Sequence, residues 1–148
     1  MARDIAASEK EEVGIYDQLS GSKIIFYYKT VETSDHLKYR GKVLKLLTAT
    51  QDTKEVQLFQ IDNILEFITG FSEESFERNG KPISSDPQKK NYYEGWKGML
   101  KEKCGDLLLT ANSVLFEETN YHIKKNSPLM MNSGNGKARG PRTKKKNT

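Results

Sequence analysis

Apolar and polar positions in the first seventy residues follow mostly the pattern of β-strands. Residues 23–31, KIIFYYKTV, are rich in β-branched and aromatic residues, which is the composition favoured in strands. Alternation with a period of two places Ile24, Phe26 and Tyr28 on one face. We therefore expect a half-buried strand here.

Two further apolar stretches, residues 39–50 and 55–61, predict an antiparallel hairpin. The polar loop of four residues between them has a length that commonly joins hairpin strands. Gly41 lies inside the first stretch, where a glycine often marks a bulge or a sharp bend at a barrel corner.

The next segments are less regular. Residues 63–71 fit a strand and a short helix equally well, so both remain open. Residues 72–90 are polar and predict a long loop with a tight turn at Asn79–Gly80.

A helical stripe follows within residues 92–109. It begins at Trp96, Met99 and Leu100 and continues through Cys104, which we therefore expect to pack in the core. Residues 106–116 are also apolar enough to end in another strand.

These elements together predict a mostly β fold: a small SH3-like barrel or strongly bent sheet with one accessory helix. Residues 1–19 are expected to form a flexible acidic arm, and residues 20–123 the β-rich domain. Residues 124–148 are rich in Ser, Asn, Gly and Lys without apolar periodicity, which predicts a disordered basic tail.

Charge also separates the domain from the tail. Residues 1–123 hold 16 basic and 20 acidic residues, whereas residues 124–148 hold eight basic residues and no acidic one. The domain, with a net charge near −4, gives no support for a nucleic-acid groove. The tail predicts weak contact with a polyanion or binding to an import receptor.

Candidate catalytic and metal-binding residues are few. Cys104 is the only cysteine, so no intrachain disulfide can form and a reducing compartment is indicated. His36 and His122 are too few and too far apart for a metal site. We expect no enzyme activity and no cofactor, and no membrane span, because no run of about 18 apolar residues occurs.

Exposed aromatic residues are the candidate binding groups for a protein partner. Aromatic rings around a pocket can bind methylated Lys or Arg through cation–π attraction, whereas the simpler alternative is that most of these rings are core residues. The candidates are Tyr27, Tyr39, Tyr92, Tyr93 and Trp96.

Three short motifs resemble the opening of a Tudor-type SH3-like barrel. They are Gly21-x-Lys23-Ile24-x-Phe26, Tyr39-x-Gly41-x-Val43-Leu44 and Val56-x-Leu58. With the late Trp96-Lys97 pair, the chain most resembles the atypical Tudor domain at the C-terminus of coilin. The resemblance implies a non-enzymatic adaptor in nuclear ribonucleoprotein or chromatin assemblies, without a complete aromatic cage.

Two other functions remain open. One is a nucleic-acid-associated protein that binds through the basic tail and stacks bases on a β-face. The other is a pleckstrin-homology-like interaction domain. The Tudor interpretation requires Trp96 on or beside a strand, whereas the pleckstrin interpretation requires it on a long final helix that crosses the sheet.

The basic tail yields the first testable prediction, that it directs nuclear import. Its contact residues are Arg139, Arg142, Lys144, Lys145 and Lys146. A fluorescent fusion that is too large to enter the nucleus passively tests this prediction. Replacing Arg142, Lys144, Lys145 and Lys146 with Ala should move its fluorescence from the nucleus to the cytosol. Changing Lys124 and Lys125 instead is the matched control. An unchanged nuclear distribution of the first variant would contradict the prediction.

Overall fold

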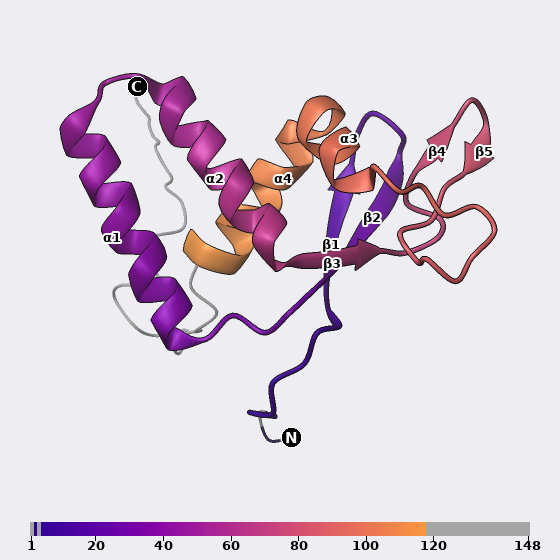
Figure 1. Ribbon diagram of the computed structural model, residues 1–148, viewed down its shortest axis with the longest axis horizontal. Helices are drawn as coiled ribbons and strands as arrows, with labels where there is room; N and C mark the ends of the chain where they lie inside the picture. Colours follow the sequence, from indigo (N-terminus) through magenta and orange to yellow (C-terminus); the bar gives the residue numbers. More distant parts are fainter. Residues whose placement is uncertain (1, 3, 118–148) are drawn as a thin grey trace, which may run out of the picture. The chain divides into compact units, whose positions relative to one another are not determined.

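A computed structural model describes residue 2 and residues 4–117 of the protein. Strands β1, β2 and β3 form an antiparallel sheet in that order, and β4 pairs with β5 in a separate hairpin (Figure 1). The elements in chain order are β1 (Glu11–Asp17), β2 (Ser22–Tyr28), α1 (Thr33–Ala49), α2 (Thr53–Phe67), β3 (Ile68–Phe71), β4 (Glu77–Arg78), β5 (Lys81–Pro82), α3 (Trp96–Lys103), α4 (Gly105–Asn112) and the π-helical turn η1 (Ser113–Glu117).

The prediction of a mostly β barrel is wrong. Among the described residues, more lie in helices than in strands, and the strands form two small open sheets instead of a closed barrel. Residues 39–50 and 55–61, expected to form a β-hairpin, belong to the antiparallel helices α1 and α2. The second and third motifs of the Tudor resemblance lie in these helices.

Local chemistry is compatible with helices in these two segments. Leu and Lys, which fill much of residues 37–47, are strong helix formers. At the start of α1 the backbone N–H of Glu32 donates to the Asp35 carboxylate at 2.9 Å. The expected hairpin loop instead contains the N-cap of α2, where Asp52 accepts from the Lys54 N–H at 3.0 Å. Such caps satisfy the free N–H groups of a first helical turn.

Other expectations are confirmed. Residues 22–28 form β2 with Ile24 and Phe26 buried on one face. Asn79 and Gly80 both have positive φ, 54° and 80°, as a tight two-residue hairpin turn requires. The stripe that begins at Trp96 is helical in α3.

Two segments differ from the expected structure, and a third contains both of the structures that were left open. Residues 63–71 are helical as far as Phe67 and then form β3, so each alternative holds for one part. The further strand considered for residues 106–116 is wrong, because this segment forms α4 and η1. Residues 11–17 of the expected arm form β1, and the tail lies outside the described residues.

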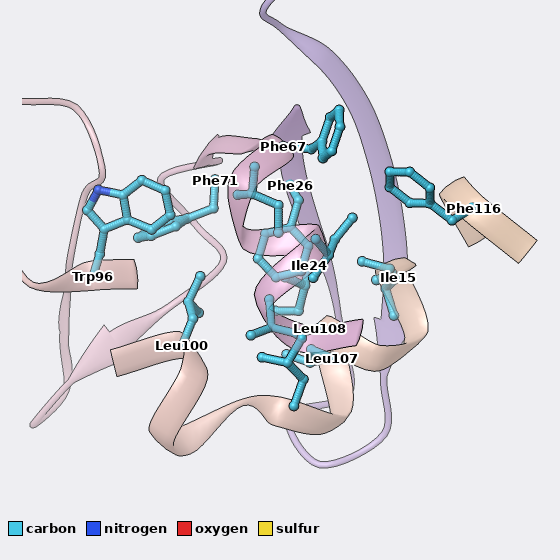
Figure 2. Close-up of a cluster of buried hydrophobic side chains, with 14 of the residues drawn as sticks. Ile15, Ile24, Phe26, Phe67, Phe71, Trp96, Leu100, Leu107, Leu108 and Phe116 are labelled. Carbon is cyan, nitrogen blue, oxygen red and sulfur yellow. The ribbon is translucent and has the colours of Figure 1, made fainter. Parts of the chain in front are cut away.

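The core lies between one face of the sheet and the helices. In the β1–β2 register, Ile15 stands opposite Ile24 and Val13 opposite Phe26. Leu107 and Leu108 of α4 point toward this face from the helical side (Figure 2). Burial of these aliphatic and aromatic side chains is the main stabilising contribution.

An aromatic side chain after α4 attaches α1 to this core. Phe116 of η1 is buried, and its ring centroid lies 4.9 Å from that of Tyr39 on α1 and 5.1 Å from that of Phe67 on α2. The Tyr39 ring also stacks on Phe59 at 5.8 Å. Tyr39 is the one residue of α1 that is fully buried.

Hydrogen bonds between helices surround the Tyr39 hydroxyl. The Asn112 amide, 1% exposed, donates to this hydroxyl at 2.8 Å and accepts from Asn63 at 2.9 Å. The hydroxyl itself donates to the Glu117 carboxylate. Burial, followed by the hydrogen bond to Glu117, raises the pKa of Tyr39 to about 12. The hydroxyl therefore remains a protonated donor at neutral pH.

We expect Asn112→Ala to lower the free energy of unfolding by about 1–3 kcal/mol, because it leaves buried polar partners on α1 and α2 unsatisfied. Urea denaturation followed by circular dichroism measures the change. Thr110→Ala on the same helix is the control, because Thr110 makes only an exposed hydrogen bond. Equal stability of Asn112→Ala and the control would show that the network does not hold α1.

Candidate functional site

The five aromatic residues predicted to bind a partner do not form one site. Tyr27 lies on the outer face of β2, where the Lys10 ammonium is 4.8 Å from its ring centroid. Tyr39 lies in the helical core. Tyr93 lies before α3, and its hydroxyl accepts from Arg78 at 3.0 Å. Each of these three tyrosines lines a different cavity.

The remaining two candidates serve the fold. Trp96 is 7% exposed, and its ring stands edge-on to Phe71 of β3 at 5.7 Å between centroids. It begins a helix of eight residues, which is not the long final helix that the pleckstrin interpretation requires. Tyr92 is half-buried in the preceding loop and donates its backbone N–H to the Lys89 carbonyl at 3.2 Å.

Cys104 has the features of a structural cysteine. It is half-buried at the junction of α3 and α4 and packs against the core. Burial, together with the carboxylates of Asp106 and Asp17, raises the pKa of its thiol. The nucleophilic thiolate is therefore scarce at neutral pH.

Two further features of the described residues bear on site chemistry. Within them, no group of three or more His, Cys, Asp or Glu side chains is arranged to hold a metal ion. In the same part of the chain, no helix combines the length and the apolar character needed to cross a bilayer.

An exposed row of leucines on α1 is the most unusual surface feature. Leu37, Leu44 and Leu47 are 64%, 63% and 56% exposed. Their spacing of seven and then three residues places them along one side of a helix. We call these three residues the leucine face of α1. Tyr39, which packs into the core, faces away from Leu37 and Leu44.

Gly41 lies on this side of α1, between Leu37 and Leu44. A glycine inside a helix costs about 0.5–1 kcal/mol relative to alanine. A Cβ placed on Gly41 would meet no atom within 4 Å, so packing within the described residues does not require the glycine. Because glycine has no side chain, the helix backbone is exposed at this position beside the leucines.

Basic residues flank the leucine face. Within its 17 residues, α1 has one acidic residue, Asp35. Its basic residues are Lys38, Arg40, Lys42 and Lys45. By helical spacing, Arg40 lies beside Leu44 and Leu47, and Lys45 lies on the other side of the row. The surface therefore combines an apolar strip with positive charge, which favours an acidic partner.

The sequence analysis missed this site because residues 39–50 were interpreted with a period of two. A period of two assigns Val43 to one face and Leu44 and Leu46 to the other. The signal that identifies the site is the helical spacing of Leu37, Leu44 and Leu47, which becomes visible only when α1 is extended back to Thr33.

Comparisons with known proteins add no relative: no family model, curated protein or solved structure matches the chain.

The absence of contacts at Gly41 yields a stability prediction. Gly41→Ala should raise the free energy of unfolding by about 0.5–1 kcal/mol, because alanine favours the helix and nothing opposes its methyl group. Thermal unfolding measures the shift. Gly80→Ala is a control of opposite sign, because φ at Gly80 is +80° and alanine is strained there. Destabilisation by Gly41→Ala would mean that the isolated fold needs this glycine.

Proposed function

We propose that the protein is a non-enzymatic interaction module whose α1 helix binds an acidic amphipathic helix of a partner protein. The observation that carries the proposal is the leucine face of α1, with three leucines more than half exposed on one side of one helix. Full burial of a leucine side chain contributes about 1.5–3 kcal/mol, so covering this row would supply much of the affinity of a helix-in-groove complex.

Charge decides between a second copy of this chain and a different partner. Two α1 helices paired through their leucine faces would bring together two segments that each have four basic residues and one acidic residue. Like charges at such positions oppose association. A partner helix with Glu or Asp beside its apolar row instead complements Arg40 and Lys45.

The missing side chain at Gly41 supports a helical partner in particular. Helices associate when side chains of one helix insert into spaces between side chains of the other. Gly41, which has no side chain, allows a partner helix to approach closely between Leu37 and Leu44 on the exposed side of α1. The basic cluster from Arg142 to Lys146 favours a nuclear setting, as an adaptor in ribonucleoprotein or chromatin assemblies.

The test uses the full chain and a fluorescein-labelled synthetic peptide of about 20 residues, a length at which an amphipathic helix can form. Leucines on one face and glutamates beside them make up the peptide. Fluorescence anisotropy should show saturable binding. Leu44→Asp and Gly41→Leu should each weaken it at least about ten-fold, since loss of one buried contact of about 1.4 kcal/mol has that effect.

Controls separate this binding from attraction to the basic tail. A scrambled peptide of the same composition cannot form an apolar face, so it reports charge attraction alone. Leu19→Asp removes a leucine that is 91% exposed in the β1–β2 turn and should leave binding unchanged. Equal binding of the two peptides, or no effect of Leu44→Asp, would contradict the proposal.

A single-stranded oligonucleotide tests the alternative of nucleic-acid association. The alternative requires micromolar binding of the oligonucleotide. If the double variant Arg40→Glu, Lys45→Glu abolishes this binding and Leu44→Asp does not change it, α1 binds nucleic acid instead of a protein helix.

A further inference from the structure

The two outer edges of the three-stranded sheet differ in how they are protected. On β3, the side-chain hydroxyl of Ser85 accepts from the Phe71 N–H at 2.9 Å and donates to the Phe71 carbonyl at 3.4 Å. This serine therefore occupies the outward hydrogen-bonding groups of Phe71. No equivalent contact covers β1 within the described part of the chain.

The hydrogen bonds of β2 show which groups of β1 face outward. The N–H and carbonyl of Ile25 are both directed to the β3 side, where they bond Ser75 at 3.1 Å and Ser72 at 3.0 Å. The direction of the backbone N–H and carbonyl groups alternates from one residue to the next along a strand. The backbone groups of Ile24 and Phe26 are therefore directed to β1, where they pair with Ile15 and Val13.

The intervening residues of β1 therefore form its free edge. Their backbone N–H and carbonyl groups point away from β2, and the residues themselves are exposed. These residues are Glu12, Gly14 and Tyr16.

Of the usual defences against strand addition, this edge has only acidic side chains. Natural edge strands are protected by Lys, Pro, bulges or very short length. β1 has seven residues in unbroken register with β2, and it contains neither Lys nor Pro. A long regular edge with unpaired backbone groups is the arrangement to which an extended peptide adds.

Charge identifies the occupant of the edge. β1 carries Glu11, Glu12 and Asp17 and no basic residue, and Lys23 of β2 lies over Gly14. Pairing β1 with β1 of a second copy would oppose these acidic residues, which is unfavourable across strands. A basic extended segment is complementary.

A cavity of about 370 Å³ lies beside the turn end of β1. Leu19, Leu107 and Tyr16 supply apolar surface, and Asp17 and Asp106 supply two carboxylates. A Lys or Arg side chain satisfies both features, because its aliphatic stem packs on apolar groups while its charged end remains near the carboxylates.

We infer that the free edge of β1 binds an extended, basic segment of a partner protein as a fourth strand of the sheet. This surface is separate from the leucine face of α1 and takes a partner of opposite charge. It therefore goes beyond the proposed function and does not depend on it.

The test measures binding of a fluorescein-labelled peptide of alternating lysine and valine to the full chain. A peptide with the same sequence but N-methylated at every residue keeps its charge and loses its backbone donors. The unmodified peptide should bind at least ten-fold more tightly. Equal binding of the two would overturn the inference, because it would show charge attraction alone.

Two variants at one position test the edge itself. Gly14→Pro removes the outward N–H, whereas Gly14→Ala keeps it, and a Cβ at this position meets only the flexible end of Lys23. Gly14→Pro should weaken peptide binding at least ten-fold and Gly14→Ala should not, with both variants showing the circular dichroism of the parent protein.

Leu44→Asp, which tests the leucine face of α1, should leave binding of the lysine–valine peptide unchanged. The failure of one proposal is therefore distinguishable from the failure of the other. A dimer in size-exclusion chromatography that Gly14→Pro dissociates would assign the edge to a second copy of the chain and overturn the inference.

Discussion

The contact of Tyr39 with Phe116 and Asn112 is the constraint on which the arrangement of the helices depends. Tyr39 is the only fully buried residue of α1, so this side chain is central to the attachment of a helix of 17 residues. Its ring packs on Phe116, and its hydroxyl joins α1 to α2, α4 and η1 through hydrogen bonds. Buried networks of this kind specify one arrangement when every member is satisfied.

Attachment through one side leaves the other side of α1 exposed. A helix held by the face of Tyr39 must present residues on its opposite side to solvent, and in this chain those residues include leucines and a glycine. Neither the leucines nor the glycine stabilises the isolated protein, because an exposed leucine side chain contributes no burial energy and a glycine weakens a helix. Departures from local consistency of this kind are expected where a surface has a function.

The two proposed surfaces have opposite charge and use different backbone geometry. α1 presents side chains of a basic helix, whereas β1 presents backbone groups of an acidic strand. A helical and an extended partner would therefore not compete for the same groups. Such a separation suits an adaptor that holds two partners at once, and electrostatic complementarity would direct each partner to its own surface.

The sequence by itself determined the local features that depend on few residues. The composition and alternation of KIIFYYKTV identify β2, the Asn79–Gly80 pair identifies a tight turn, and the stripe from Trp96 identifies α3. Each of these signals is complete within a short window, because turn geometry and side-chain direction repeat over two to four residues.

Only the tertiary structure decided the state of α1, α2 and β1. The apolar residues of residues 39–50 fit two periods, and the helix prevails because Tyr39 meets Phe116 and Asn112, which lie more than seventy residues away along the chain. Likewise β1 is weakly apolar and becomes a strand by pairing with β2. Which faces remain uncovered depends on such distant contacts, so the leucine face and the free edge become apparent only in the folded chain.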